Sequence, residues 1–276
     1  MKKKCSVYAL LAVLMFSSCS SFDKLLKKKD GDPSYKYEAA KTYFAKGENT
    51  KAITLLNSVI TVMKGSDKGE ESLYMLGMCY YNDRDYQMAH ETFQQYVSTY
   101  PRGIFSENAR FNAAKALYIN SPEARLDQSA TYNAISELQT FVELYPESKN
   151  RSEAEFMIFD LQDKLVEKEL YSARLYYHMG NYLGNNYESC VITAQNALKD
   201  YPYTEYREEL SYLVVCAKYD MAHNSVLNKR VERFRDALDE CYAFLTEFPE
   251  SKYLSETNEM LRKAEKALDG VEEEVD

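Results

Sequence analysis

The histidines, cysteines and paired acids of this sequence lack the spacing of a catalytic or metal site. Its three histidines, His90, His178 and His223, lie far apart, and no HExxH or CxxC pair supplies the closely spaced ligands of a zinc site. There is also no Gly-x-Ser-x-Gly elbow and no Walker loop. Acidic doublets such as Glu70-Glu71 fit the solvent faces of helices. We therefore expect no catalytic residue, no metal and no cofactor in this chain.

Cys19 is the residue with a definite chemical assignment. A positive stub at residues 2–4 precedes an apolar run at 7–16, and two serines stand directly before Cys19. This is the pattern of a secretory signal, and the run is shorter than the roughly twenty residues that a transmembrane helix needs. The two small residues before the cysteine resemble a bacterial lipobox, although Phe16 stands where leucine is usual. We expect residues 1–18 to be removed and Cys19 to carry a lipid that anchors the chain stably.

The composition favours a helical protein that does not bind nucleic acid. The formal net charge is −9, whereas binding to phosphates needs clustered lysine and arginine. The chain has 25 Tyr and no Trp, and its nine Gly and six Pro are few, which favours long helices over glycine-rich loops. Four cysteines of the mature chain form no CxxC pair and are expected to be small core residues: Cys79, Cys190, Cys216 and Cys241.

A self-similar unit recurs along the mature chain. Proline disfavours helix at the residue before it, so each unit is predicted to end where an aromatic residue meets proline. Ser or Thr stands two places after proline in three of the four steps, well placed to cap the next helix. Successive prolines are 45, 56 and 47 residues apart, so the later units need longer helices or loops than a minimal tetratricopeptide (TPR) unit. The four steps are Tyr100-Pro101, Tyr145-Pro146, Tyr201-Pro202 and Phe248-Pro249.

The second unit supplies the TPR register, with small residues where two helices approach and large ones in the groove between them. Looser versions cover the rest, with an insertion at about Ile119–Gln128, a longer loop near His223–Lys229 and a final helix at Ser251–Leu268. The predicted fold is all-α: a right-handed TPR-like helical solenoid of about five helix pairs plus a C-terminal helix. The residues of the second unit that match the pattern are Leu76, Gly77, Tyr80, Tyr86, Ala89, Phe93 and Pro101.

The repeats give the expected domain organisation. A solenoid has no single globular core, because each helix pair buries its apolar face on its neighbours. The predicted segments are the lipoprotein signal peptide at 1–18, a lipidated linker at 19–33, N-terminal TPR repeats 1–3 at 34–146, C-terminal TPR-like repeats 4–5 with the final helix at 147–269, and an acidic tail at 270–276.

The lipobox, the short linker, the five TPR-like units and the repeated Tyr-Pro-x-Ser steps together resemble the BamD family. These are lipoproteins of the β-barrel assembly machinery in the Gram-negative outer membrane. Residues 168–177 also look like the fourth repeat of that family. The resemblance implies a non-enzymatic scaffold that helps the barrel insertase BamA to fold and insert outer-membrane proteins, alongside other assembly subunits.

The resemblance also implies where the partners bind. The C-terminal repeats of the family hold the periplasmic domains of BamA, and the N-terminal repeats receive the β-signal of unfolded outer-membrane proteins. The partner surface that the resemblance implies here comprises Tyr203, Glu205, Tyr206 and Arg207. Ser20 and Ser21 follow Cys19 without an inner-membrane retention aspartate or an acidic export run, which indicates the periplasmic face of the outer membrane.

Three equivalent rows appear when the first helices of repeats 1–3 are aligned. Two are aromatic and seven residues apart, so they share one helix face, and lysines stand between them. An aromatic groove with ammonium groups suits an extended peptide with aromatic side chains and a terminal carboxylate. The alternative is that the rings pack between adjacent helices and the lysines are solvated. The rows are Tyr37, Tyr74 and Phe111; Phe44, Tyr81 and Tyr118; and Lys41, Met78 and Lys115.

Two other functions compete with barrel assembly. A periplasmic TPR lipoprotein could instead coordinate cell-envelope or division proteins, and this alternative stays open. Glycan capture by a SusD-like lipoprotein is disfavoured, because such proteins need exposed tryptophan platforms and this chain has no Trp.

Overall fold

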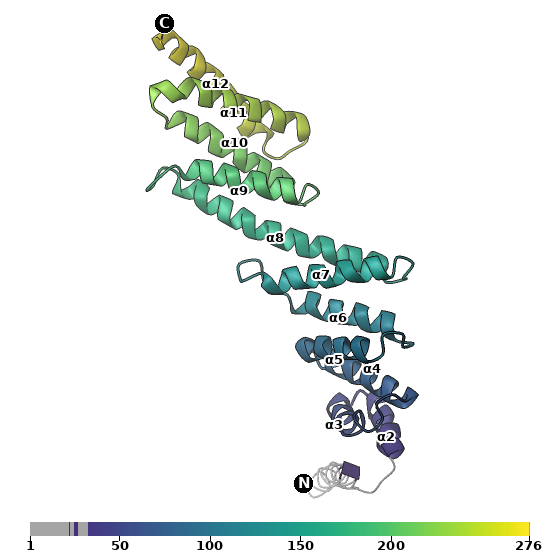
Figure 1. Cartoon of the computed structure of the whole chain (residues 1–276). Coiled ribbons are helices and arrows are strands. Elements are labelled where there is room, and N and C mark those ends of the chain that lie inside the picture. The colour runs from purple at the N-terminus through teal and green to yellow at the C-terminus, as the bar shows by residue number, and fades with distance from the viewer. Residues whose placement is uncertain (1–21, 23–24, 27–32, 276) are drawn as a thin grey trace, which may run out of the picture. The chain divides into compact units, whose positions relative to one another are not determined.

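The computed structural model describes residues 22, 25–26 and 33–275, and this part of the chain forms helices and no strand (Figure 1). Residues 1–18 and Cys19, expected to be the signal peptide and the lipid site, lie outside the described residues. The described helices are α2 (Pro33–Ala45), α3 (Asn49–Val59), α4 (Asp67–Asn82), α5 (Tyr86–Thr99), α6 (Ser106–Asn120), α7 (Ser129–Leu144), α8 (Arg151–Met179), α9 (Asn186–Asp200), α10 (Arg207–His223), α11 (Leu227–Glu247) and α12 (Leu254–Val275).

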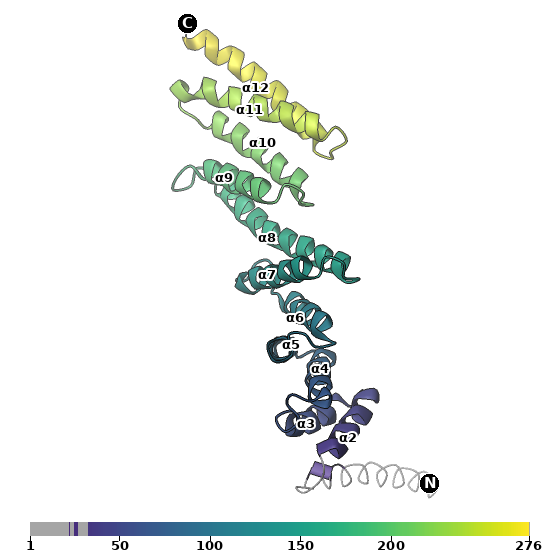
Figure 2. The same ribbon diagram turned by 45° about the vertical axis from the view of Figure 1, so that its right-hand side comes forward.

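The helices follow one another as antiparallel hairpins (Figure 2). Within hairpins, α2 packs on α3, α4 on α5 and α10 on α11. Between hairpins, α3 packs on α4, α5 on α6, α9 on α10 and α11 on α12. Helices α2 to α11 are thus five pairs and α12 is a single final helix. The predicted all-α, TPR-like arrangement of five helix pairs plus a C-terminal helix is confirmed.

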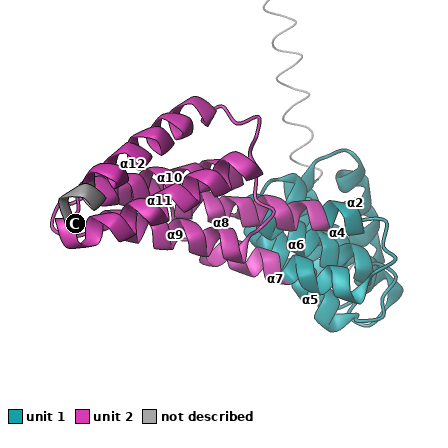
Figure 3. Ribbon diagram, turned by 90° about the horizontal axis from the view of Figure 1, so that it is seen from above, with its two compact units in different colours: residues 1–120, 137–154 teal, residues 121–136, 155–276 magenta. Residues whose placement is uncertain are grey.

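The chain divides into two compact units (Figure 3). Unit 1 comprises residues 1–120 and 137–154, and unit 2 comprises residues 121–136 and 155–276. Unit 1 contains helices α2 to α6 whole, and unit 2 contains α9 to α12 whole. Each unit has buried clusters of its own, as expected when neighbouring helix pairs supply one another's core.

In unit 1, Gly77 sets how closely α4 approaches α5. A Cβ added at Gly77 would lie 2.5 Å from the ring of Phe93, which is fully buried. Leu76 and Ala89 are buried beside them. The small and large residues of the predicted TPR pattern therefore pack as expected, because Gly77 has no side chain and leaves room for the ring of Phe93 in the groove.

The core of unit 2 joins α8, α9 and α10. Leu170, Cys190, Ala194 and Leu210 belong to one buried cluster, and each has none or about 1 % of its surface exposed. The four predicted core cysteines are all buried free thiols. Burial raises the pKa of the Cys190 thiol to about 12, so the reactive thiolate is scarce at neutral pH.

The chain departs from expectation at the α10–α11 loop and at the C-terminal tail. The α10–α11 loop is shorter than predicted, because α10 extends to His223 and α11 begins at Leu227. Helix α12 runs to Val275, so the predicted acidic tail is helical to that point; its residues are good helix formers and no proline stops them. Phe22, in the linker, contacts the ring of Tyr43 edge-on at 5.5 Å between centroids.

We predict that Gly77→Ala destabilises unit 1 by about 1–3 kcal/mol, because the added methyl group overlaps the buried ring of Phe93. Gly270→Ala is the matched control, since Gly270 is also helical and a Cβ there meets nothing within 4 Å. The control should unfold at or slightly above the wild-type temperature, because alanine favours helix by about 1 kcal/mol. Thermal unfolding followed by circular dichroism measures both, and equal melting temperatures would contradict the packing argument.

Candidate partner-binding sites

Each serine or threonine two places after proline forms the same pair of contacts. Its hydroxyl donates to a carboxylate on an earlier helix: Ser148 to Glu107 at 2.6 Å and Ser251 to Glu208 at 2.6 Å. The same oxygen accepts the backbone N–H two residues later, at 3.1 Å for Ser148 and 3.0 Å for Ser251. The predicted capping role is not seen, because the accepted N–H belongs to the residue just before the next helix; the hydroxyl instead closes a turn that leads into that helix and ties the end of one repeat to its own first helix.

The third such step uses a carboxylate much further along its helix. Thr204 donates to Asp163 at 2.6 Å, and Asp163 lies in the middle of α8, whereas Glu107 and Glu208 are the second residues of α6 and α10. Helix α8 is 29 residues long, against 15 for α6 and 17 for α10. The long spacing between Pro146 and Pro202 is therefore extra helix at the start of α8.

A cleft of about 750 Å³ in unit 2 lies beside this extension of α8. Two exposed rings line it: Phe156 has 65 % and Phe159 has 55 % of its surface exposed. The rest of the lining comes from the α6–α7 loop, the following turns of α8 and the Pro202 step. Its charged residues are Glu123, Arg125, Asp160, Asp163, Lys164, Glu167 and Glu205.

The α6–α7 loop forms an ordered wall of this cleft. The predicted insertion is confirmed as the connection between Asn120 and Ser129. Gln128 is buried and donates to the carbonyl oxygen of Glu123 at 2.7 Å, which closes the loop on itself. Two contacts dock the loop on α8: the Arg125 guanidinium stacks 4.4 Å from the centroid of the Tyr171 ring, and Lys164 donates to Ser121 at 2.5 Å.

A second, smaller cleft lies on the other side of the Pro202 step. It has a volume of about 250 Å³, and Phe159 and Asp163 line both clefts. Tyr203 lines the smaller one and is 86 % exposed. The two clefts therefore flank one ridge on α8, with aromatic side chains on each side.

The predicted partner surface, Tyr203, Glu205, Tyr206 and Arg207, is one continuous turn at the Pro202 step. Tyr203 and Glu205 are exposed, and Glu205 and Tyr206 line the large cleft. Burial, with the nearby charge of Glu167, raises the pKa of Tyr206 to about 12. Arg207 is held within the chain, because it donates to Glu247 at 2.5 Å and to the Pro202 carbonyl oxygen at 3.2 Å.

The first predicted aromatic row of unit 1 lies mostly inside the protein. Tyr37 is 2 % exposed and Phe111 is 6 % exposed, with the Phe111 ring 5.3 Å from the ring of Phe141. Tyr74 is half-buried and stacks on Phe105 at 4.5 Å between centroids. These rings pack between adjacent helices, the arrangement that the sequence left open as an alternative.

The second aromatic row, Phe44, Tyr81 and Tyr118, is half-buried and keeps part of each ring at the surface. Tyr81 meets Tyr86 edge-on at 5.5 Å between ring centroids. Burial raises the pKa of Tyr81, so it is a neutral phenol that can both donate and accept a hydrogen bond. In unit 1, this row offers more aromatic surface to a partner than the first.

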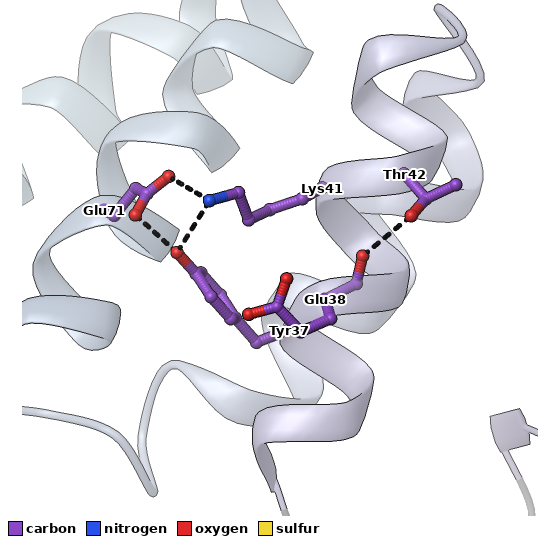
Figure 4. Close-up of polar contacts among 5 residues, drawn as sticks. All are labelled: Tyr37, Glu38, Lys41, Thr42 and Glu71. Atoms are coloured by element: carbon purple, nitrogen blue, oxygen red, sulfur yellow. Dashed lines mark hydrogen bonds and ion pairs between the residues drawn. The ribbon is translucent and has the colours of Figure 1, made fainter.

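The two lysines between the rows are paired with carboxylates of the next repeat. Lys41 lies 3.0 Å from Glu71, which also accepts a hydrogen bond from the Tyr37 hydroxyl (Figure 4). Lys115 donates to Glu153 at 2.6 Å, and this bond raises the pKa of Lys115. Burial raises the pKa of Glu71, but the bonds from Tyr37 and Lys41 outweigh burial and leave that pKa below its ordinary value.

Met78, the middle member of that row, takes part in a contact without charge. Asn112 of α6 donates to the Tyr74 hydroxyl at 3.2 Å and to the Met78 sulfur at 3.5 Å. Each of the three positions therefore connects one first helix to the next, by ion pairs at the two lysines and by an amide at Met78. The row is a line of contacts between repeats, with its ammonium charges neutralised.

The exposed rings Phe156 and Phe159, and Asp160 beside them, were not among the predicted site residues. The sequence did contain a pattern that could have indicated them: two phenylalanines three residues apart share one face of a helix that is otherwise rich in charge. Their exposure depends on where α8 meets the Pro202 step, which the sequence pattern does not show. Among the described residues, no three metal-binding side chains lie together and no helix is long and apolar enough to cross a membrane.

Stacked helix pairs joined at proline steps define a TPR-like helical protein. The family model YfiO, described as an outer membrane lipoprotein, matches residues 29–185 and 179–276. The chain belongs to this family of outer membrane lipoproteins.

A curated relative is the outer membrane protein assembly factor BamD of Caulobacter vibrioides. It is 25 % identical over 138 residues, which is 50 % of this chain and 45 % of that protein. The chain therefore matches a little less than half the length of this relative. Two crystal structures of nearly identical TPR-like repeats from Podosopora anserina each share 17 % identity at a TM-score of 0.33, covering 80 % of this chain and 99 % and 100 % of theirs.

We predict that Ser251→Ala lowers the free energy of unfolding by about 1–2 kcal/mol, because it removes the hydroxyl that bonds Glu208 and accepts the N–H of Tyr253 just before α12. Ser255→Ala is the matched control, since Ser255 is exposed in the first turn of the same helix. Chemical denaturation should place the control within about 0.5 kcal/mol of wild type. If the two variants are equally stable, the hydroxyl does not hold the step together.

Proposed function

We propose that this protein is a non-enzymatic scaffold of outer-membrane protein assembly. The observation that carries the proposal is the family match, which extends over residues 29–276. The named relative, an outer membrane protein assembly factor, supports it. The surface of stacked helix pairs suits this role, because such surfaces bind extended or folded polypeptides without transforming them.

The proposed attachment is a lipid on Cys19, with the repeats on the periplasmic side of the outer membrane. The signal pattern, with Ser17 and Ser18 directly before Cys19, supports the lipid. Ser20 and Ser21 after Cys19 support the periplasmic side of the outer membrane. A lipid anchor would keep both units close to the membrane in which the barrels are inserted. The linker is short, and its described residue Phe22 already packs on the first repeat.

The proposed main partner is a BamA-like barrel insertase, held by the surface of unit 2 at the Pro202 step, with other assembly subunits nearby. Tyr203 supports this assignment because it is a large, rigid ring with 86 % of its surface exposed. Aromatic side chains and arginine are common anchors of protein interfaces. Arg207 follows Tyr203 by four residues, and its guanidinium is held by Glu247 and the Pro202 carbonyl oxygen.

Unit 1 is proposed to receive the β-signals of unfolded outer-membrane proteins through the rings of its second row. The half-buried Phe44, Tyr81 and Tyr118 supply stacking surface for aromatic side chains of the signal. A terminal carboxylate would have to compete with Glu71 or Glu153 for the lysines. The rings therefore contribute more to the proposed affinity than the ammonium groups.

The first test isolates the mature lipidated chain, with Cys19 intact, from detergent-solubilised outer membranes and quantifies its partners by mass spectrometry. A barrel insertase should be retained, and Tyr203→Ala with Arg207→Ala should reduce its recovery at least about tenfold, as expected when anchors worth about 1.4 kcal/mol or more are lost. Tyr182→Ala with Arg262→Ala is the control, because both residues are exposed elsewhere in unit 2. Recovery of division proteins in place of an insertase would support the competing function.

The second test measures binding of a fluorescent peptide that ends in a β-signal with C-terminal phenylalanine. Tyr81→Ala with Tyr118→Ala should weaken binding by about tenfold or more through lost stacking. Tyr132→Ala with Tyr182→Ala removes two exposed tyrosines of unit 2 and should leave the affinity unchanged. Unchanged affinity in the first variant, with a native circular dichroism spectrum, would refute the assignment to this row.

A further inference from the structure

We propose that the large cleft of unit 2 binds an extended segment of a partner polypeptide in which arginine side chains alternate with apolar ones. The inference rests on the proposed function only in taking the chain to be a binder of polypeptides. It adds the chemistry of one partner segment, and four observations on the cleft carry it: its charge, its rings, its shape and its ordered wall.

The charge of the cleft favours a cationic occupant. Five carboxylates line it, from Glu123, Asp160, Asp163, Glu167 and Glu205, against the two cations Arg125 and Lys164. Both cations already have contacts, because Arg125 lies over the Tyr171 ring and Lys164 bonds Ser121. Among the described residues, no ion pair reaches Glu123, Asp160 or Glu205. Both partners of these cations are neutral, so the cations keep their charge, but the five carboxylates still exceed the two cations and favour a positive group entering the cleft.

The rings of the cleft favour arginine among the cations. Phe156 and Phe159 present most of their surface to solvent, and Tyr171 and Tyr206 lie deeper. A planar guanidinium stacks on such rings and forms paired hydrogen bonds with carboxylates. The chain itself shows this geometry, since Arg125 is stacked over Tyr171 while Tyr171 donates to Glu167 at 2.6 Å.

The shape of the cleft favours an extended segment with apolar residues between the arginines. The exposed rings lie along α8, and Phe159 also borders the smaller cleft that contains Tyr203. A chain running from one cleft to the other would pass over the ridge formed by Phe159 and Asp163. Exposed rings gathered at one place mark an interaction surface more than a scattering of single residues does.

The wall of the cleft is formed before any partner arrives. Ala124 is buried, Gln128 bonds the carbonyl oxygens of Glu123 and Leu126, and Thr131 donates to Gln128 at 2.7 Å. On the opposite side, Asp163 holds Thr204 and the backbone N–H of Glu205. Binding therefore requires little ordering of the protein, which favours affinity for a flexible segment.

The test measures fluorescence anisotropy of a short labelled peptide of alternating leucine and arginine, added to the purified mature chain. Asp160→Asn with Glu205→Gln should weaken binding at least about tenfold, and so should Phe156→Ser with Phe159→Ser. The affinity should also fall as salt is raised, because part of the attraction is electrostatic. A peptide with glutamate in place of arginine should not bind.

The matched control is Asp236→Asn with Glu250→Gln, which removes one aspartate and one glutamate charge from exposed positions elsewhere in unit 2. It should keep the wild-type affinity for the peptide. An equal loss in the control would show attraction to the acidic chain in general and overturn the proposal. So would unaltered binding in the phenylalanine variant or no binding to the wild-type chain. Because no insertase is present, these outcomes are independent of the partner recovered from outer membranes.

Discussion

At three of the four proline steps, what joins the step to an earlier helix is the hydrogen bond from a serine or threonine hydroxyl, two places after proline, to a carboxylate on that helix. Ser148, Thr204 and Ser251 form it to Glu107, Asp163 and Glu208. The proline ends one helix, and the hydroxyl oxygen then accepts an N–H near the start of the next. One side chain thereby fixes both the end of a repeat and the direction in which the chain continues.

The position of that carboxylate in the middle of α8 accompanies the large cleft of unit 2. Because Asp163 lies in the middle of α8, the residues just before it extend past the proline step and carry Phe156, Phe159 and Asp160. The docked α6–α7 loop then closes the other side of the cleft. The extra turns at the start of α8 thus place exposed rings and several carboxylates beside the Pro202 step.

The polar rows of the first helices have a structural role that limits how they bind ligands. Lys41 and Lys115 pair with Glu71 and Glu153 across neighbouring repeats of unit 1. In unit 2, Arg174 pairs with Glu209 in the same way. Such partly exposed pairs each contribute up to about 1 kcal/mol, so they align the helices more than they stabilise them. The recognition proposed for unit 1 would therefore depend on its partly exposed rings.

The sequence by itself determined the helix pairs, because proline steps and the spacing of small and large residues act locally and repeat. It predicted the Gly77–Phe93 packing, the inserted loop and the buried cysteines, and it placed the serine and threonine hydroxyls at the proline steps without showing that they bond a carboxylate instead of capping a helix. The tertiary structure decided which surface residues are available. It buried Tyr37 and Phe111 and paired the lysines, and it left Phe156 and Phe159 exposed. Burial and ion pairing depend on which helix lies opposite, and that neighbour is more than thirty residues away in the chain, as for Lys115 and Glu153.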